Sequence, residues 1–158
     1  MREDFSWESY QQEPWQFAEH ISITSQSKVG KTTLCDLLRQ QLPSNFRFES
    51  VGAIVRQEAK RRNMEIGEFG KYILDHPEER LDESFDNQMF GIGQMCKKLV
   101  GEARLAHITM PHAYHVLLKC PHHVRAERHQ RAVGGEYEKI FSSILFRDID
   151  NELRYDVL

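Results

Sequence analysis

The feature that most constrains this chain is the segment 20–38, where a short β-branched run leads through a loop into an amphipathic helix. Within it, Ser25 is followed after four residues by Gly30, Lys31 and Thr32. This is the spacing of a phosphate-binding loop, with serine in place of the usual first glycine. In such a loop, successive backbone N–H groups and the positive end of the following helix surround a phosphate. The segment therefore predicts a nucleotide-binding α/β domain.

The loop residues have distinct expected roles. Gly30 allows a close approach of the backbone, the Lys31 ammonium reaches the β- and γ-phosphates, and the Thr32 hydroxyl is a ligand of Mg²⁺. A Cβ at the first position is less comfortable than glycine in a strained turn, so we expect Ser25 to weaken phosphate binding. The expected nucleotide contacts are Ser27, Lys28, Val29, Gly30, Lys31, Thr32 and Thr33.

Composition limits the classes of function. At 158 residues the chain is long enough for one domain with its own core. A net charge of −3 argues against a nucleic-acid surface, and no apolar run is long enough to span a membrane. Three irregularly spaced cysteines favour reduced thiols in the cytoplasm. Six histidines lack the spacing of zinc ligands and are interpreted as ordinary surface residues: His107, His112, His115, His122, His123 and His129.

Strand and helix patterns alternate after the loop. Strands are predicted at 46–52, 97–105 and 114–120, and the last is apolar enough to be central in a parallel sheet. The predicted helices are one after the loop that buries Leu34, Leu37 and Leu38, one at 53–64, broken helices over 65–96, one from Pro121, and one at 136–155. This order predicts a doubly wound, mostly parallel sheet with helices on both faces.

Two acidic stretches carry weaker expectations. The run Asp75, Glu78, Glu79, Asp82, Glu83 and Asp86 is interpreted as a solvated face. Residues 1–19 form an acidic aromatic leader before the domain at 20–158. Because exposed tryptophans are unfavourable, we expect Trp7 and Trp15 to dock on that domain.

Several blocks, taken in order, resemble the cytidylate kinase-like P-loop proteins, most closely the short form typical of archaea. They are SVGAIVRQEAKRRNMEIGEFGKY from Ser50, DHPEERLD from Asp75, EARL from Glu102, VLLKCPHHVRAER from Val116 and RDIDNELRY from Arg147. The resemblance implies a P-loop NTPase fold, with a monophosphate-binding segment near 50–95 and a small lid near 131–147. It also implies phosphoryl transfer from ATP, with Mg²⁺, to a nucleoside monophosphate, preferably CMP or dCMP.

The resemblance implies roles for individual residues as well. Arg56 matches the arginine of a Gly-x-x-x-Arg block and Arg104 that of a Glu-x-Arg-Leu block, and both then hold the acceptor phosphate. Asp82 matches an acidic residue that faces the acceptor base or sugar. The implied catalytic set is Lys31 with the lid arginines Arg128, Arg131 and Arg147, and Arg154 is a weaker member. Arginine suits this task because its planar fork binds phosphate through two bonds.

Three departures from the family pattern leave alternatives open. Ser25 to Lys28 replace glycines of the loop, Ala103 replaces a glycine, and the chain stops at Leu158 where the family continues. The alternatives are a non-catalytic nucleotide-binding relative and a kinase for another small phosphate acceptor. From the early stop we expect poor discrimination between ATP and GTP. We also expect an exposed sheet edge that favours homo-oligomers.

Overall fold

The computed structural model describes residues 19–155, with side chains described to residue 152. The leader tryptophans and the Arg154 side chain, for which roles are expected above, lie outside this part. The elements are β1 (Glu19–Ser25), α1 (Lys31–Gln41), β2 (Arg47–Ser50), α2 (Val51–Arg61), α3 (Ile66–Asp75), η2 (Pro77–Glu79), α4 (Leu81–Met95), β3 (Lys98–Ala103), α5 (Ala106–Thr109), β4 (Tyr114–Leu118), α6 (His122–Val133) and α7 (Tyr137–Tyr155).

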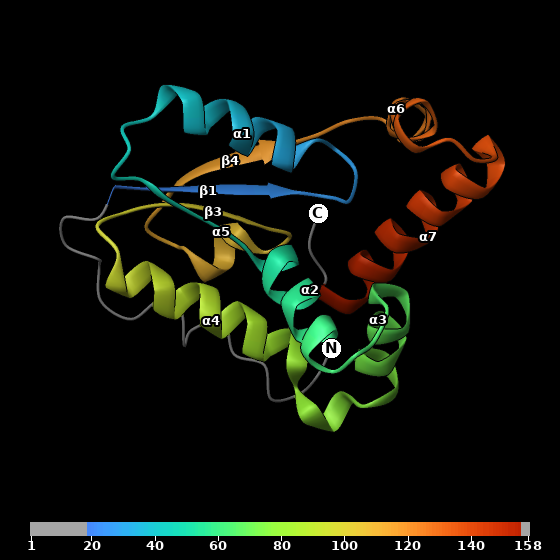
Figure 1. The fold of residues 1–158 in the computed structure, drawn as a ribbon, viewed down its shortest axis with the longest axis horizontal. Helices are drawn as coiled ribbons and strands as arrows, with labels where there is room; N and C mark the ends of the chain where they lie inside the picture. The colour runs from blue at the N-terminus through green and yellow to red at the C-terminus, as the bar shows by residue number, and fades with distance from the viewer. Residues whose placement is uncertain (1–18, 156–158) are drawn as a thin grey trace.

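The four strands form one parallel sheet in the order β2-β3-β1-β4 (Figure 1). The prediction that 114–120 is a central strand is wrong, because β4 lies at the edge and Tyr114 is 76% exposed. An apolar run indicates that a strand has a buried face, and Val116 does pack against Ile23. Strand order depends instead on crossovers that the run itself does not encode.

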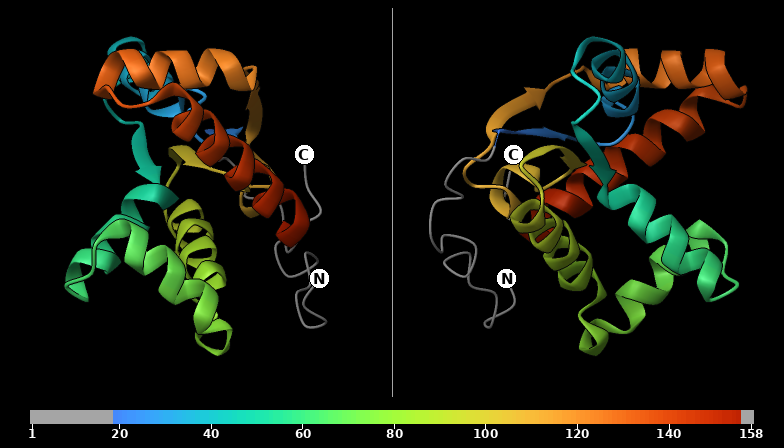
Figure 2. Two further views of the ribbon diagram at one scale, coloured as in Figure 1. Left: turned by 90° about the vertical axis from the view of Figure 1, so that its right-hand side faces the viewer. Right: turned by 60° about the vertical axis from the view of Figure 1, so that its left-hand side comes forward.

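Helices cover both faces of the sheet, as the sequence predicts (Figures 1 and 2). Helix α1 packs on one face through Cys35, which lies in a cluster with Ile23 and Val100. On the other face Met89 of α4 meets Leu99 and Met110. The expected burial of Leu37 is wrong, since this side chain is 56% exposed and Cys35 takes the inward position of that turn.

Helices α2, α3 and the beginning of α4 form a helical arm beside the sheet (Figure 2). Its core is the cluster Ala59, Phe69, Ile73 and Phe85. Helix α2 begins at Val51, two residues before the predicted start, because the Ser50 hydroxyl at the end of β2 accepts a bond from the Ala53 N–H. The arm therefore starts directly at the carboxyl end of a strand.

The last two helices, α6 and α7, form a hairpin in which they pack against each other, and the longer α7 then continues beyond α6 (Figures 1 and 2). The turn between them contains Gly134 and Gly135, with φ values of 77° and 103°. This left-handed conformation favours glycine. The turn lies inside the segment 131–147 for which the sequence analysis expects a lid, and that role remains a prediction.

Candidate active site

The phosphate-binding loop lies at the carboxyl edge of the sheet, between the end of β1 and the start of α1. Ser25 is fully buried and belongs to β1, so its backbone is extended and the strain expected there is absent. The left-handed positions of the loop are instead Lys28, with φ 60°, and Gly30, with φ 116°. Of the residues that replace loop glycines, Lys28 is therefore the one whose backbone conformation is strained.

Lys31 bends back over the loop that precedes it. Its Nζ donates to the Ser25 hydroxyl at 2.9 Å and to the carbonyl oxygens of Ser25 and Gln26 at 3.0 and 3.1 Å. Burial lowers the pKa of Lys31 to about 8, with Arg104 and Arg147 lowering it further and Glu102 opposing them. Because the ammonium is buried and lies near two other cations, a bound anion would stabilise its charged form.

Glu102 lies beside this lysine at the end of β3, and the sequence analysis assigned it no role. Its carboxylate accepts bonds from the Ser50 hydroxyl at 2.7 Å and from the Cys35 thiol at 3.3 Å. Burial, with help from Glu102, raises the pKa of the Cys35 thiol to about 12. The thiol is therefore a hydrogen-bond donor that holds the carboxylate and not a nucleophile.

A cavity of about 330 Å³ opens between the loop and α6. The residues that line it are Lys28, Gly30, Lys31, Thr32, Thr33, Arg125, Arg128 and His129. The structure therefore brings Arg128 to the loop, and Arg147 is close enough to lower the pKa of both Lys28 and Lys31. Arg131 lies outside this cavity, where it is 74% exposed and bonds Glu127 of its own helix at 3.3 Å.

Arg125 is the main site residue that the sequence analysis missed. Its side chain is fully buried, donates from one Nη to the Ser27 carbonyl at 2.9 Å, and pairs with the buried Asp148 of α7. The arginine-rich pattern of α6 contains Arg125, Arg128 and Arg131, but spacing does not reveal which of the three points inward. The periodicity of a helix with few apolar residues gives no clear buried face.

Arg104 follows β3 and donates to the Asn151 side-chain oxygen of α7, one helical turn beyond Arg147. Asp86 of α4 faces the same region and is only 9% exposed, so the interpretation of its acidic run as a solvated face is wrong at this position. Burial raises the pKa of Asp86 to about 7; Asp82 and Glu83 raise it further, whereas Arg104 opposes the shift. The half-buried Asp82 is thus one helical turn from a carboxyl group that lies near Arg104.

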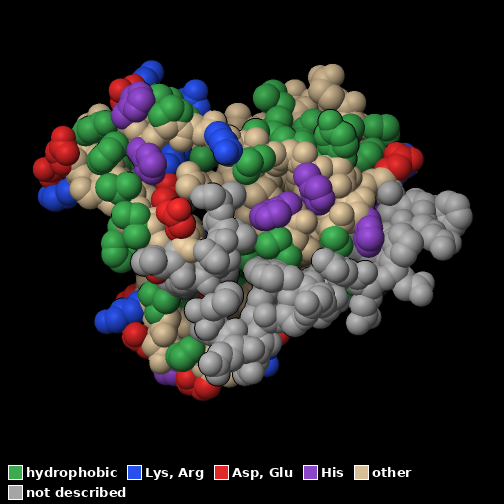
Figure 3. Space-filling model, turned by 180° about the vertical axis from the view of Figure 1, so that it is seen from behind, with side chains coloured by type: hydrophobic (Ala, Val, Ile, Leu, Met, Phe, Trp, Pro, Cys, Tyr) green, Lys and Arg blue, Asp and Glu red, His purple; other side chains and the backbone are tan. Residues whose placement is uncertain are grey.

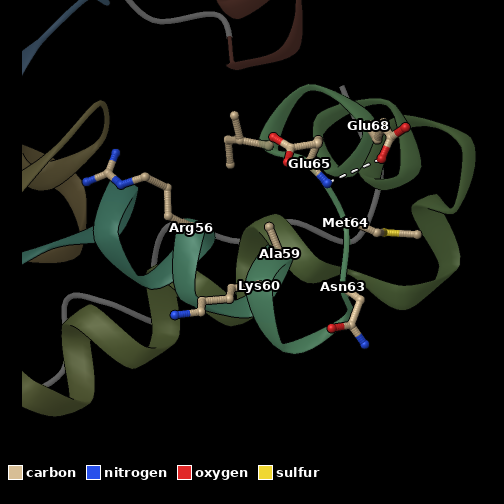
Figure 4. A pocket seen from close by; sticks show the side chains of 8 residues that line it. Arg56, Ala59, Lys60, Asn63, Met64, Glu65 and Glu68 are labelled. Carbon is tan, nitrogen blue, oxygen red and sulfur yellow. Dashed lines mark hydrogen bonds between the residues drawn. The ribbon is translucent and has the colours of Figure 1, made fainter.

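Arg56 lies on α2 at one end of a second cavity, of about 470 Å³, whose far end is the start of α3. Figure 4 shows its guanidinium pointing away from Asn63 and Met64, while Glu65 and Glu68 are joined by a hydrogen bond of 3.2 Å. One Nη of Arg56 lies 3.5 Å from the position that a Cβ on Gly52 would take. A Cβ at position 52 would therefore be in ordinary van der Waals contact with the arginine, so its placement does not require glycine there.

Histidine side chains gather on the rear face of the molecule (Figure 3). Two histidines bond hydroxyls of β1: His115 meets Ser22 at 2.6 Å and His107 meets Thr24 at 3.3 Å. Within residues 19–152, no three histidine, cysteine, aspartate or glutamate side chains are grouped so that they could hold a metal ion. In the same part of the chain, no helix is both long enough and apolar enough to cross a bilayer.

Comparison with known proteins agrees with this geometry. A family profile described as an AAA domain matches residues 21–152. The cytidylate kinase of Pyrococcus furiosus is 35% identical over 136 residues, which cover 85% of this chain and 68% of that protein. The chain belongs to the cytidylate kinase family. Another cytidylate kinase, from Pyrococcus abyssi, is 34% identical over 138 residues, covering 85% of this chain and 72% of its own length.

A solved structure supports the fold of this cytidylate kinase family member. The shikimate kinase from Bacteroides thetaiotaomicron superposes with a TM-score of 0.59, covering 87% of this chain and 81% of its own, at 17% sequence identity. At this identity the similarity concerns the fold alone. Together with the parallel sheet and the loop at its carboxyl edge, it confirms the α/β P-loop NTPase fold that the sequence predicts.

Proposed function

We propose that this cytidylate kinase family member transfers a phosphoryl group from ATP to a nucleoside monophosphate, with CMP or dCMP as the preferred acceptor. The observation that carries the proposal is the position of Lys31. It is bonded to the loop at 2.9 to 3.1 Å and lies within electrostatic range of both the Arg104 and the Arg147 guanidinium. Convergent cations suit a reaction that needs two phosphates aligned and their charge neutralised. Relatives named cytidylate kinase support the choice of acceptor.

On the donor side, the loop and the first turn of α1 would hold the ATP phosphates. Residues Ser27 to Thr33 supply the backbone N–H groups, and Lys31 would exchange its bonds to Ser25 and Gln26 for bonds to phosphate oxygens. The exposed Thr32 hydroxyl would be the oxygen ligand that the loop offers to Mg²⁺, an ion that prefers oxygen donors. When bound, Mg²⁺ neutralises charge on the donor phosphates.

On the acceptor side, Arg56 and Arg104 would bind the monophosphate, and Asp82 would face its sugar or base. Arg104 comes from the carboxyl end of a central strand, and the α7 side chain Asn151 orients its guanidinium. Arg128 and Arg147 would then stabilise charge on the transferring group from the α6–α7 hairpin. Arg131 belongs to the same proposed set. It would have to leave Glu127 to take part, a change that an exposed ion pair resists only weakly.

A coupled assay of ATP consumption against CMP, dCMP, UMP, AMP and GMP tests the proposal. We expect turnover to be fastest with CMP or dCMP and to fall at least about a hundredfold in Lys31→Ala, because transition-state charge is left uncompensated. Arg39→Ala is the matched control, since Arg39 is on the same helix but half exposed, where it pairs with Asp36 at 2.7 Å and lies over the Phe48 ring. Turnover in Lys31→Ala that equals the wild type would refute the donor-loop assignment.

One observation favours a second candidate function, a non-catalytic nucleotide-binding protein. Lys28 occupies a left-handed position of the loop that glycine would fill without strain, and burial, with Arg147, lowers the pKa of its amine. If calorimetry detected ATP binding to the wild type while none of the five monophosphates was phosphorylated, this second function would replace the first.

A further inference from the structure

We propose that Arg125 and Asp148 are positioning residues that hold the phosphate-binding loop and the arginine-bearing helix α7 in register with each other. The inference rests on the proposed function, because the loop matters here as the binding site of the donor phosphates. Neither residue would touch the reacting atoms. They would act through the backbone of Ser27 and through the placement of Arg147.

The contacts form a continuous chain from the loop to α7. One Nη of Arg125 donates to the Ser27 carbonyl at 2.9 Å, and the other donates to Asp148 Oδ2. His122 Nε2 also lies 3.2 Å from Asp148 Oδ2. The Arg125 and Asp148 side chains are 0% and 5% exposed, so the pair is scarcely weakened by solvent. The loop, α6 and α7 thus meet at one guanidinium.

Arg125 and Asp148 are joined through only one atom of each group. An arginine and a carboxylate usually pair through two parallel bonds. Here Arg125 Nε and Asp148 Oδ1 are buried without a hydrogen-bond partner among the described residues, and so is Ser27 Oγ. Since buried polar groups are normally satisfied, this geometry indicates that the guanidinium is turned toward the loop carbonyl and not simply toward its counter-ion.

Holding the Ser27 carbonyl has a direct effect on the phosphate cradle. The carbonyl of Ser27 and the N–H of Lys28 belong to one planar trans peptide, so they point in opposite directions. A bond from Arg125 on the carbonyl side therefore directs the Lys28 N–H to the other side of the loop backbone. Lys28 is the residue with φ 60°, a conformation that its own side chain disfavours and that an external bond can maintain.

The same anchor places Arg147. Asp148 is its neighbour in the chain, and helix α7 is continuous through both residues. Fixing Asp148 against Arg125 therefore fixes the backbone from which Arg147 projects toward Lys28 and Lys31, whose pKa values it lowers. The donor loop and the lid arginine would accordingly lose their alignment together when the pair is broken.

Calorimetric titration of ATP and of CMP into Arg125→Met, Asp148→Asn and wild type tests the inference. We expect Arg125→Met to weaken ATP binding by about tenfold or more, the loss of one charged hydrogen bond, while the CMP affinity stays within about twofold. Asp148→Asn keeps an oxygen for Arg125 and loses only the charge, so we expect an intermediate loss for ATP. In turnover, the KM for ATP should rise more than the KM for CMP in both variants.

Ile144→Val is the matched control, because Ile144 is fully buried on the same helix and offers no polar group. It should lower the melting temperature and leave both affinities unchanged. ATP affinity equal to wild type in folded Asp148→Asn or Arg125→Met would overturn the inference. So would losses of ATP affinity that simply parallel the fall in melting temperature across all three variants. If Arg125→Met does not fold, Asp148→Asn alone decides. Failure of the wild type to bind ATP would instead overturn the proposed function.

Discussion

The Nζ of Lys31 lies 2.9 Å from the hydroxyl of Ser25, so the lysine of the phosphate-binding loop is bonded to the residue that replaces the loop's usual first glycine. Ser25 in turn donates its hydroxyl proton to the Gln26 carbonyl at 2.8 Å, which leaves the hydroxyl oxygen free to accept from the ammonium. The substitution that departs from the motif therefore supplies a bond that glycine lacks. It holds the lysine at the loop before any phosphate is bound.

The pKa of Lys31 predicts a pH dependence of donor binding. Because burial lowers this pKa to about 8, the ammonium is present below that pH and must be regenerated by proton uptake above it. Phosphate favours the charged form, so ATP affinity should fall as pH rises through about 8, approaching tenfold per pH unit. Calorimetric titrations of ATP from about pH 6.5 to about 9.5 measure this dependence. Repeating them in buffers that differ in ionisation enthalpy detects the proton taken up on binding. In Lys31→Ala the same titrations should show no step near pH 8.

Arg104 and Asn151 should affect the acceptor together. Arg104→Ala removes a guanidinium from the proposed monophosphate site and should weaken CMP binding by about 1.5–3 kcal/mol. Asn151→Leu removes the amide whose oxygen accepts from Arg104 but leaves the guanidinium in place, so we expect a smaller loss of the same kind. Separate titrations of CMP and ATP provide the measurement. A fall in ATP affinity with intact CMP affinity in Arg104→Ala would place this arginine on the donor side.

Asp86 should make the protein less stable as pH rises. Its folded-state pKa of about 7 lies above the ordinary value of 3.8, so the folded protein binds the extra proton between these values and stability falls as pH increases across that window. Asp86→Asn removes the dependence and should raise the stability at neutral pH by an amount on the order of 2 kcal/mol. Melting temperatures at about pH 5 and about pH 8 test this. Equal wild-type and variant slopes would contradict the expectation.

Two glycines should respond oppositely to alanine. A Cβ on Gly101, in central strand β3, would lie 2.3 Å from the Sδ of the buried Met110, so Gly101→Ala should destabilise the protein by about 1–3 kcal/mol while that side chain shifts. A Cβ on Gly67, in helix α3, meets nothing within 4 Å. Gly67→Ala should therefore stabilise by about 0.5–1 kcal/mol. Chemical denaturation of both variants gives the comparison, and a neutral Gly101→Ala would show that Met110 repacks freely.

The phosphate-binding loop could be predicted from the sequence because its residues lie close together along the chain. Ser25 and Lys31 are six positions apart, and the strand before and the helix after them are visible as local patterns. The parallel α/β architecture followed from the same alternation. Arg104 and Arg56 were proposed as acceptor-site residues because each lies in a short sequence motif of the family, which again is a local pattern.

The residues that complete the site are paired across long intervals, and no local pattern reports such pairs. Arg125 meets a carbonyl 98 positions earlier and a carboxylate 23 positions later. Asp86 belongs to a run of acids whose other members include exposed residues, so its burial depends on how α4 packs in the fold and not on composition. The edge position of β4 is of the same kind, since strand order is decided by the paths of the crossovers.

The turn at Gly134 and Gly135 determines where the whole of α7 points. Both residues use a backbone conformation that other amino acids rarely adopt, and the Gly134 N–H closes α6 on the Gln130 carbonyl at 2.8 Å. One extra residue absorbed into the first turn of α7 would displace every later side chain by about 100° around the helix axis. Arg147, Asp148 and Asn151 would then leave the loop and Arg104 at the same time, even though none of the three had been altered. Two residues without side chains therefore set the direction of α7, although they lie 12 or more positions before the charged residues Arg147 and Asp148.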